Sequence, residues 1–108
     1  MAATSSRGPG GHEADQRYRF MLFVAGNEMN SRLALENLRL ICETHLKGRY
    51  ELEVIDVFED YERAHQERVL VTPALIALLP ERRVALLGNL SDTKRVLSSL
   101  GVGEVQSA

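Results

Sequence analysis

The sequence predicts an α/β domain in which the elements follow one another as strand, helix, strand, helix, strand, strand and helix. A continuous apolar run at residues 20–24 is typical of a strand that is covered on both faces of a parallel or mixed sheet. Apolar residues then recur at helical spacing between residues 34 and 42. Two later apolar segments are separated only by a short turn at residues 80–82, which favours an antiparallel pair.

The first strand is expected at residues 18–24 and ends at a break formed by Gly26 and Asn27. Asn30 or Ser31 is expected to cap the helix that follows, because a short polar side chain accepts hydrogen bonds from the free amides of a first turn. The buried stripe of this helix is predicted to consist of Ala34, Leu35, Leu38, Ile41 and Cys42.

Three more strands are predicted from shorter segments. The second is expected at residues 50–57, where apolar and charged residues alternate at the start. A short helix, alone or with a loop, is expected within the charged residues 56–68. The third strand is expected at residues 69–79, interrupted by Pro73, and the fourth at residues 84–87.

The last helix is expected to begin at a Ser91 cap and to bury Val96, Leu97 and Leu100. The resulting order of elements is that of thioredoxin-like folds, which place a cis-proline where this chain has Pro73. A proline inside an apolar run is otherwise tolerated only at an edge, a strand start or a bulge. The loop that faces this proline normally holds Cys-x-x-Cys, but residues 26–31 contain no cysteine. A binding module is therefore expected rather than a redox enzyme.

Length and composition predict the domain organisation and the compartment. In 108 residues we expect one domain at residues 17–102, between a disordered tail at residues 1–16 and a frayed end at residues 103–108. The formal net charge of -2 argues against a nonspecific nucleic-acid binder. No apolar run is long enough to span a bilayer, no signal peptide is visible and a single cysteine fits a reducing environment, so a cytoplasmic protein is expected.

Residues that often carry chemistry in enzymes are scattered along this chain. Cys42 lies on an apolar helix stripe, where a small buried side chain is expected and a reactive thiol is the alternative. The three histidines are not spaced as metal ligands, and neither a phosphate loop nor a serine elbow is present. We therefore predict no enzyme, cofactor or metal site. A thiol oxidoreductase is the alternative that the lack of loop cysteines disfavours.

A set of short segments follows one order at near-constant spacing over about residues 18–102. The segments are residues 23–27, 30–31, 47–50, 54–57, 72–75, 79–80, 88–91 and 95–97. Together they resemble the KaiB family of the bacterial circadian clock. The resemblance implies either a thioredoxin-like fold or a rearranged βαββααβ ground state, which is tetrameric. Clock members carry a longer acidic C-terminal extension that is absent here, so we expect the thioredoxin-like fold.

The resemblance also implies a non-enzymatic adaptor that docks on a KaiC-type ATPase ring and modulates circadian timing or stress-response output. KaiA or a SasA-like histidine kinase are further expected partners, whereas nucleic acid and membranes are not expected. A signalling module like the sensory domain of SasA and a structural homo-oligomer are the alternatives. The residues expected to contact the partner are Tyr50, Glu53, Arg68, Arg82 and Arg83. Those expected to shape the fold are Gly26, Asn27, Thr72, Pro73 and Gly88.

The chain departs from the usual family pattern at several charged positions. The family usually has an Arg-Arg pair where this chain has Val84 and Ala85, and the arginines of this chain lie two places earlier. Because side chains alternate along a strand, a shift of two residues keeps the same face. Glu53 stands where clock members are neutral or basic, whereas Arg68 keeps a basic residue. These departures indicate a divergent paralogue.

Overall fold

The computed structural model describes residues 17–102, which form seven elements in the predicted order. They are β1 (Tyr18–Val24), α2 (Met29–His45), β2 (Tyr50–Asp56), α3 (Tyr61–Gln66), β3 (Ala74–Leu79), β4 (Arg82–Leu87) and α4 (Thr93–Leu100). The predicted tail at residues 1–16 and the predicted frayed end at residues 103–108 lie outside the described residues.

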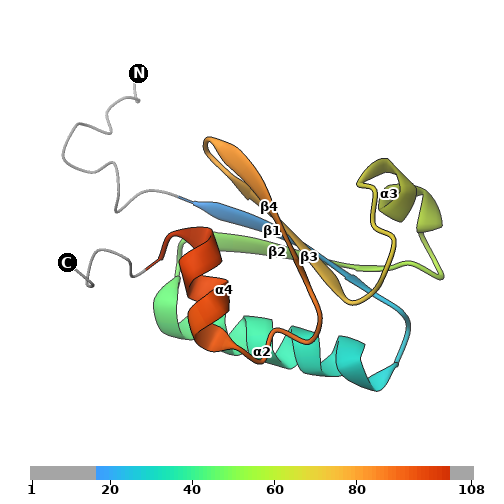
Figure 1. The fold of residues 1–108 in the computed structure, drawn as a ribbon, viewed down its shortest axis with the longest axis horizontal. Helices are drawn as coiled ribbons and strands as arrows, with labels where there is room; N and C mark the ends of the chain where they lie inside the picture. Colours follow the sequence, from blue (N-terminus) through green and yellow to red (C-terminus); the bar gives the residue numbers. More distant parts are fainter. Residues whose placement is uncertain (1–16, 103–108) are drawn as a thin grey trace.

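The strands of the described chain form one sheet with the order β2-β1-β3-β4. β1 pairs in parallel with β2 and antiparallel with β3, and β3 pairs antiparallel with β4 as the short turn predicted. Helices α2 and α4 cover one face of the sheet, whereas α3 lies on the opposite side near one end (Figure 1). β2 and β4 are therefore the two edge strands of the sheet.

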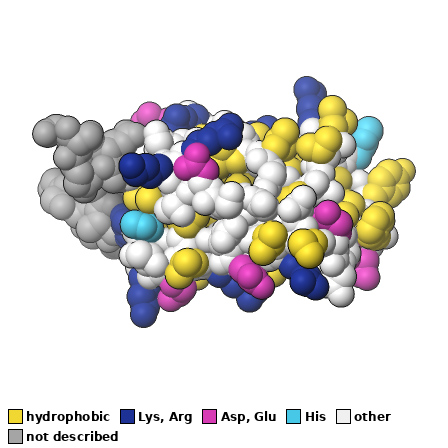
Figure 2. Space-filling model, turned by 60° about the horizontal axis from the view of Figure 1, so that its bottom comes forward, with side chains coloured by type: hydrophobic (Ala, Val, Ile, Leu, Met, Phe, Trp, Pro, Cys, Tyr) yellow, Lys and Arg dark blue, Asp and Glu magenta, His cyan; other side chains and the backbone are white. Residues whose placement is uncertain are grey.

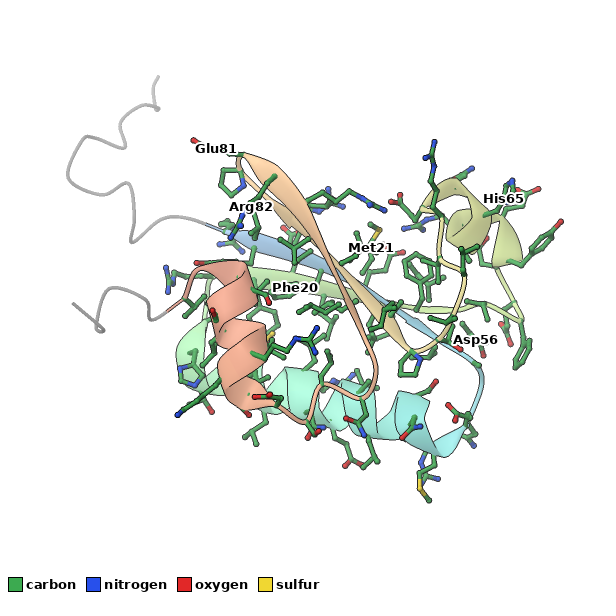
Figure 3. All side chains as sticks on the ribbon, in the orientation of Figure 1. Phe20, Met21, Asp56, His65, Glu81 and Arg82 are labelled. Atoms are coloured by element: carbon green, nitrogen blue, oxygen red, sulfur yellow. The ribbon has the colours of Figure 1, made fainter. Side chains whose placement is uncertain are left out.

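β1 supplies side chains to both faces, because successive residues of a strand point to opposite sides. Phe20 points toward α2 and α4, whereas Met21 points to the side of α3 (Figure 3). The larger core, between the sheet and α2 and α4, contains among others Leu22, Leu38, Leu75, Val96 and Leu100. The smaller core, on the side of α3, contains Met21, Phe23, Ile55, Ala64, Ala74 and Ile76.

The first helix begins earlier than predicted, and neither Asn30 nor Ser31 is its cap. The N-cap of α2 is Glu28, whose carboxylate accepts hydrogen bonds from the Ser31 amide and from the Ser31 hydroxyl, both at 3.2 Å. Ser31 is buried instead, and its hydroxyl accepts a hydrogen bond from the Ala25 amide at 3.0 Å. A carboxylate is a stronger acceptor than a hydroxyl and is favourable at the positive end of a helix, which explains the difference.

The last helix begins later than predicted, with Asp92 rather than Ser91 as its N-cap. The Asp92 carboxylate accepts a hydrogen bond from the Arg95 amide at 3.1 Å. Ser91 belongs to the preceding turn, in which its own amide donates to the side-chain oxygen of Asn89 at 3.0 Å. The predicted helix itself is present and buries Val96 and Leu100, whereas Leu97, also predicted to be buried, is only half-buried.

The third strand begins at Ala74 and not at residue 69, so residues 69–73 form a loop. Proline has no amide to donate to a strand ladder, and the ladder between β1 and β3 begins just after Pro73. The Val69 amide donates to the Ala64 carbonyl oxygen at 2.9 Å, which directs the chain toward α3. The Thr72–Pro73 peptide bond is cis.

The hairpin between β3 and β4 is tighter than predicted. Leu79 pairs with Arg82 and Leu78 pairs with Arg83, so the turn consists of only two residues, 80 and 81. β4 therefore begins at Arg82 rather than at residue 84, and both arginines are strand residues instead of turn residues. β2 ends at Asp56, one residue before the predicted end.

Cys42 is fully buried in the larger core, as predicted. Burial raises the pKa of the Cys42 thiol from 9.0 to about 12, and the neighbouring Glu43 carboxylate adds to the effect. A thiol that stays protonated is a poor nucleophile. The alternative of a reactive Cys42 thiol is therefore disfavoured on physical grounds.

The raised pKa of Cys42 predicts a loss of stability at alkaline pH. The thiol ionises near pH 9 in the unfolded chain but near pH 12 in the folded chain. Between these values a rise in pH therefore stabilises the unfolded state relative to the folded state. We expect the free energy of unfolding to fall by up to about 1.4 kcal/mol per pH unit from this group alone. A Cys42→Ala variant lacks this contribution, so an equal pH slope in both proteins would contradict the assignment. Urea unfolding at a series of pH values measures the slopes.

Two leucines on α2 provide a matched test of the core. Leu38 is fully buried, whereas Leu40, on the same helix, is 67% exposed. We expect Leu38→Ala to lower the free energy of unfolding by about 2–5 kcal/mol, because it leaves a cavity between helix and sheet. Leu40→Ala is expected to change it by less than about 0.5 kcal/mol. Urea unfolding at neutral pH measures both, and similar losses would show that this face of α2 is not the packed one.

Candidate functional site

A groove lies at the end of the sheet where β1 and β2 finish and β3 begins. The ends of β1 and β2 lie beside the start of β3, because β1 is parallel to β2 and antiparallel to β3. The groove has a volume of about 430 Å³, and its floor includes Ala25 and Val57. One wall is formed by Phe58 and by Tyr61 and His65 of α3, and the other by the loop residues 69–72. We call this feature the α3 groove.

The walls of the α3 groove expose large apolar side chains. Leu70 is 92% exposed, Phe58 77% and Tyr61 70%, and Val71 is also exposed. Figure 2 shows hydrophobic side chains gathered at the right-hand end of the molecule, beside a histidine and acidic side chains. Apolar side chains that gather on a surface mark a binding site more often than scattered ones do. The α3 groove is therefore the candidate functional site.

The loop after β1 is fitted closely against one wall of this groove. Gly26 has φ +55°, a conformation that other residues rarely adopt, and a Cβ atom there would lie 3.4 Å from the Phe58 ring. Asp56 joins the two segments, because its Oδ1 accepts hydrogen bonds from the amides of Gly26 and Phe58. Figure 3 places Asp56 at this end of the sheet, near α3.

The residues predicted to shape the fold lie mostly around the groove. Thr72 lines it, and the adjacent Pro73 is buried. The Pro73 carbonyl oxygen accepts a hydrogen bond from the Gly88 amide at 3.0 Å, and Gly88 has φ +101°. Asn27 is exposed in the turn after Gly26. Ala25 and Thr72 both line the groove, so the loop that contains Gly26 lies beside the segment that precedes β3.

Glu53, on the edge strand β2, contacts α3. The two terminal nitrogens of Arg63 donate to the two carboxylate oxygens of Glu53 at 3.0 and 3.1 Å. The same guanidinium lies 3.5 Å from the Met21 sulfur. These hydrogen bonds from Arg63 lower the pKa of the Glu53 carboxyl. Glu53 is thus engaged within the chain.

Arg83, on the opposite edge strand β4, contacts the end of α3. Its Nη2 donates to the Glu67 carbonyl oxygen at 2.8 Å and to the Glu67 carboxylate at 3.1 Å. Glu67 is the C-cap of α3. Arg68 follows it with φ +63°, and its side chain is exposed and has no hydrogen-bond or ion-pair partner among residues 17–102.

Tyr50 and Arg82 lie away from the groove, on the side of α2 and α4. The Tyr50 hydroxyl donates to the Glu43 carboxylate at 2.7 Å, and this hydrogen bond raises the pKa of Tyr50. Arg82 donates to the Ser99 carbonyl oxygen at 3.1 Å, and Figure 3 places it beside α4, at the other end of the molecule from His65. The five predicted contact residues thus do not form one patch.

Sequence reasoning missed the apolar walls of the groove. Val69, Leu70 and Val71 were assigned to the third strand, although Pro73 signals that the ladder begins only after it. Phe58 and Tyr61 belong to the segment 56–68 that the sequence characterised only by its charge, and both are exposed. Within residues 17–102 no group of three metal-ligating side chains occurs, and no helix is long and apolar enough to cross a bilayer. The arrangement suits the binding of an apolar surface.

The comparison with known structures identifies the fold. The N-terminal domain of Synechococcus elongatus SasA matches with a TM-score of 0.68 at 23% identity, over 94% of this chain and 94% of that chain. The thioredoxin Deadhead of Drosophila melanogaster matches with a TM-score of 0.65 at 17% identity, over 82% and 83% of the two chains. The fold is thioredoxin-like, as predicted, with the order βαβαββα rather than the rearranged βαββααβ.

Sequence comparison identifies the family. The KaiB domain matches residues 21–102 of the chain. The circadian clock oscillator protein KaiB of Synechococcus sp. (strain CC9311) is 46% identical over 83 residues, which are 77% of this chain and 70% of that protein. The circadian clock protein KaiB3 of Synechocystis sp. is 38% identical over 81 residues, which are 75% and 79% of the two chains. The chain therefore belongs to the KaiB family.

Proposed function

We propose that this chain is a non-enzymatic cytoplasmic adaptor that docks on a KaiC-type ATPase ring and modulates circadian timing or stress-response output. The observation that supports the proposal most directly is the α3 groove, whose exposed walls a partner would cover. Its position supports it too, because in redox members of this fold the loop at Gly26 carries cysteines and here carries none. The site is built for contact rather than for thiol chemistry.

The apolar walls favour docking by burial of large side chains. Leu70 and Phe58 are among the most exposed large apolar residues of the described chain. Burial of one such side chain contributes about 1.5–3 kcal/mol. The gain is partly offset by the ordering of the groove and of the partner. A few such contacts are enough for specific docking, and the charges around the groove influence the rate of encounter and the choice of partner.

A binding titration against a hexameric KaiC-type ATPase tests the proposal. The ring is loaded with ATP or with ADP, and the complex is detected by size-exclusion chromatography or native mass spectrometry. Nucleotide-dependent binding is the expected result. Failure to bind in either state would refute this partner, and a KaiA-like protein or a SasA-like histidine kinase is then titrated in the same way.

A matched pair of variants tests whether the α3 groove is the docking surface. We expect Leu70→Ser to weaken binding to the ring roughly tenfold or more, because a buried leucine side chain is lost from the interface. Leu40→Ser removes another exposed leucine, from α2 on the other face of the sheet, and is expected to leave the affinity unchanged. Equal effects of the two substitutions would place the interface elsewhere. Isothermal titration calorimetry measures both affinities.

A further inference from the structure

We propose that Glu53 and Arg83 are positioning residues, which hold α3 from the two edges of the sheet and thereby set the width of the α3 groove. The sequence alone suggested that both contact the partner directly. The inference rests on the proposed function only in treating this groove as the docking surface.

Helix α3 has few other means of attachment to the sheet. It is six residues long, and Ala64 is its only buried residue. A helix of this length does not persist in water without tertiary contacts, because the cost of nucleation is not recovered over so few residues. One wall of the groove is therefore a weakly packed element, whose place depends on polar contacts.

The first of these contacts fixes α3 to β2. Arg63 and Glu53 form a two-point pair with distances of 3.0 and 3.1 Å. A planar guanidinium bonded to both carboxylate oxygens restricts orientation as well as distance. Because Arg63 lies between Tyr61 and His65 on α3, this pair positions the wall that those two residues form.

The second contact fixes the end of α3 to β4. Arg83 holds both the carbonyl oxygen and the carboxylate of Glu67, the C-cap residue from which the chain runs into the second wall at residues 69–72. β2 and β4 are three strand spacings apart, each of about 4.8 Å. The two pairs therefore hold α3 from opposite edges of the sheet.

Both pairs are partly exposed to solvent, so dissolved ions weaken them. When either pair is lost, α3 keeps its single apolar anchor and gains freedom to move relative to residues 69–72. The side chains of Glu53 and Arg83 already have partners within the chain, which they would have to give up to bind a partner's charge. The width of the groove, and through it the strength of docking, then depends on these two pairs.

Pulsed electron paramagnetic resonance measures the width directly in the full-length chain without any partner. Nitroxide labels are attached to Tyr61→Cys and Val71→Cys, one on each wall. The native Cys42 thiol is buried and remains unlabelled. We expect a single narrow distance distribution that becomes broader and shifts to longer distances in Glu53→Gln and in Arg83→Gln. Salt at about 1 M, where the screening length is about 3 Å, is expected to broaden it in the unsubstituted background.

The chain offers a matched control for each substitution. Glu51 lies on the same strand as Glu53 but pairs with Arg19 at 3.7 Å, away from α3. Arg82 neighbours Arg83 but donates to the carbonyl oxygen of Ser99 in α4. Glu51→Gln and Arg82→Gln are expected to leave the distance distribution unchanged. Thermal melts confirm that each variant is folded.

A charge exchange separates positioning from direct contact. Relative to Glu53→Gln, the double variant Glu53→Arg with Arg63→Glu is expected to restore both the narrow distance distribution and the affinity for the ring. Restored width without restored affinity would overturn the inference by showing that Glu53 touches the partner. An unchanged distribution in both Glu53→Gln and Arg83→Gln, or an equal change in the controls, would also overturn it. Because the distances are measured without the ring, a ring that does not bind refutes only the proposed function.

Discussion

Burial of β1 on both of its faces is the constraint on which the rest of the structure depends. From Phe20 to Val24 every side chain of this strand is buried, so both faces of the sheet must be covered. The apolar sides of α2 and α4 together cover one face. The other face is left to a short helix and the loops around it. One side of the sheet is therefore covered by a large core and the other by a small one.

The proposed binding surface, the α3 groove, lies on the lightly covered side. A proline at the entry to β3 keeps residues 69–72 out of the ladder, so their apolar side chains remain beside α3 rather than in the core. The same end of the sheet carries the loop at Gly26, which Asp56 fastens to Phe58. In this fold the position is one where redox proteins carry thiols, and here an apolar groove remains.

Most of the charged and polar side chains that were predicted to contact a partner form hydrogen bonds within the chain. Four of the five charged or polar residues that the sequence nominated for contact are engaged within the chain, and Arg68 is the exception. A charged side chain with no partner nearby in the sequence often pairs with a residue that is distant along the chain. Arg63 and Glu67, which sequence analysis assigned to a charged segment, prove to be the partners of two strand residues.

The sequence by itself determined the order of elements, the pairing of β3 with β4, the burial of Cys42 and the family, because these follow from local periodicity, short turns and matching segments. The sequence wrongly predicted that Val69 to Val71 belong to a strand, and it wrongly predicted the N-caps of α2 and α4. Competing hydrogen bonds decide where these three elements begin. Only the tertiary structure decided which residues form the groove and which charges meet. Contacts between α3 and the two edge strands join residues 10 to 16 positions apart, and no local pattern encodes them.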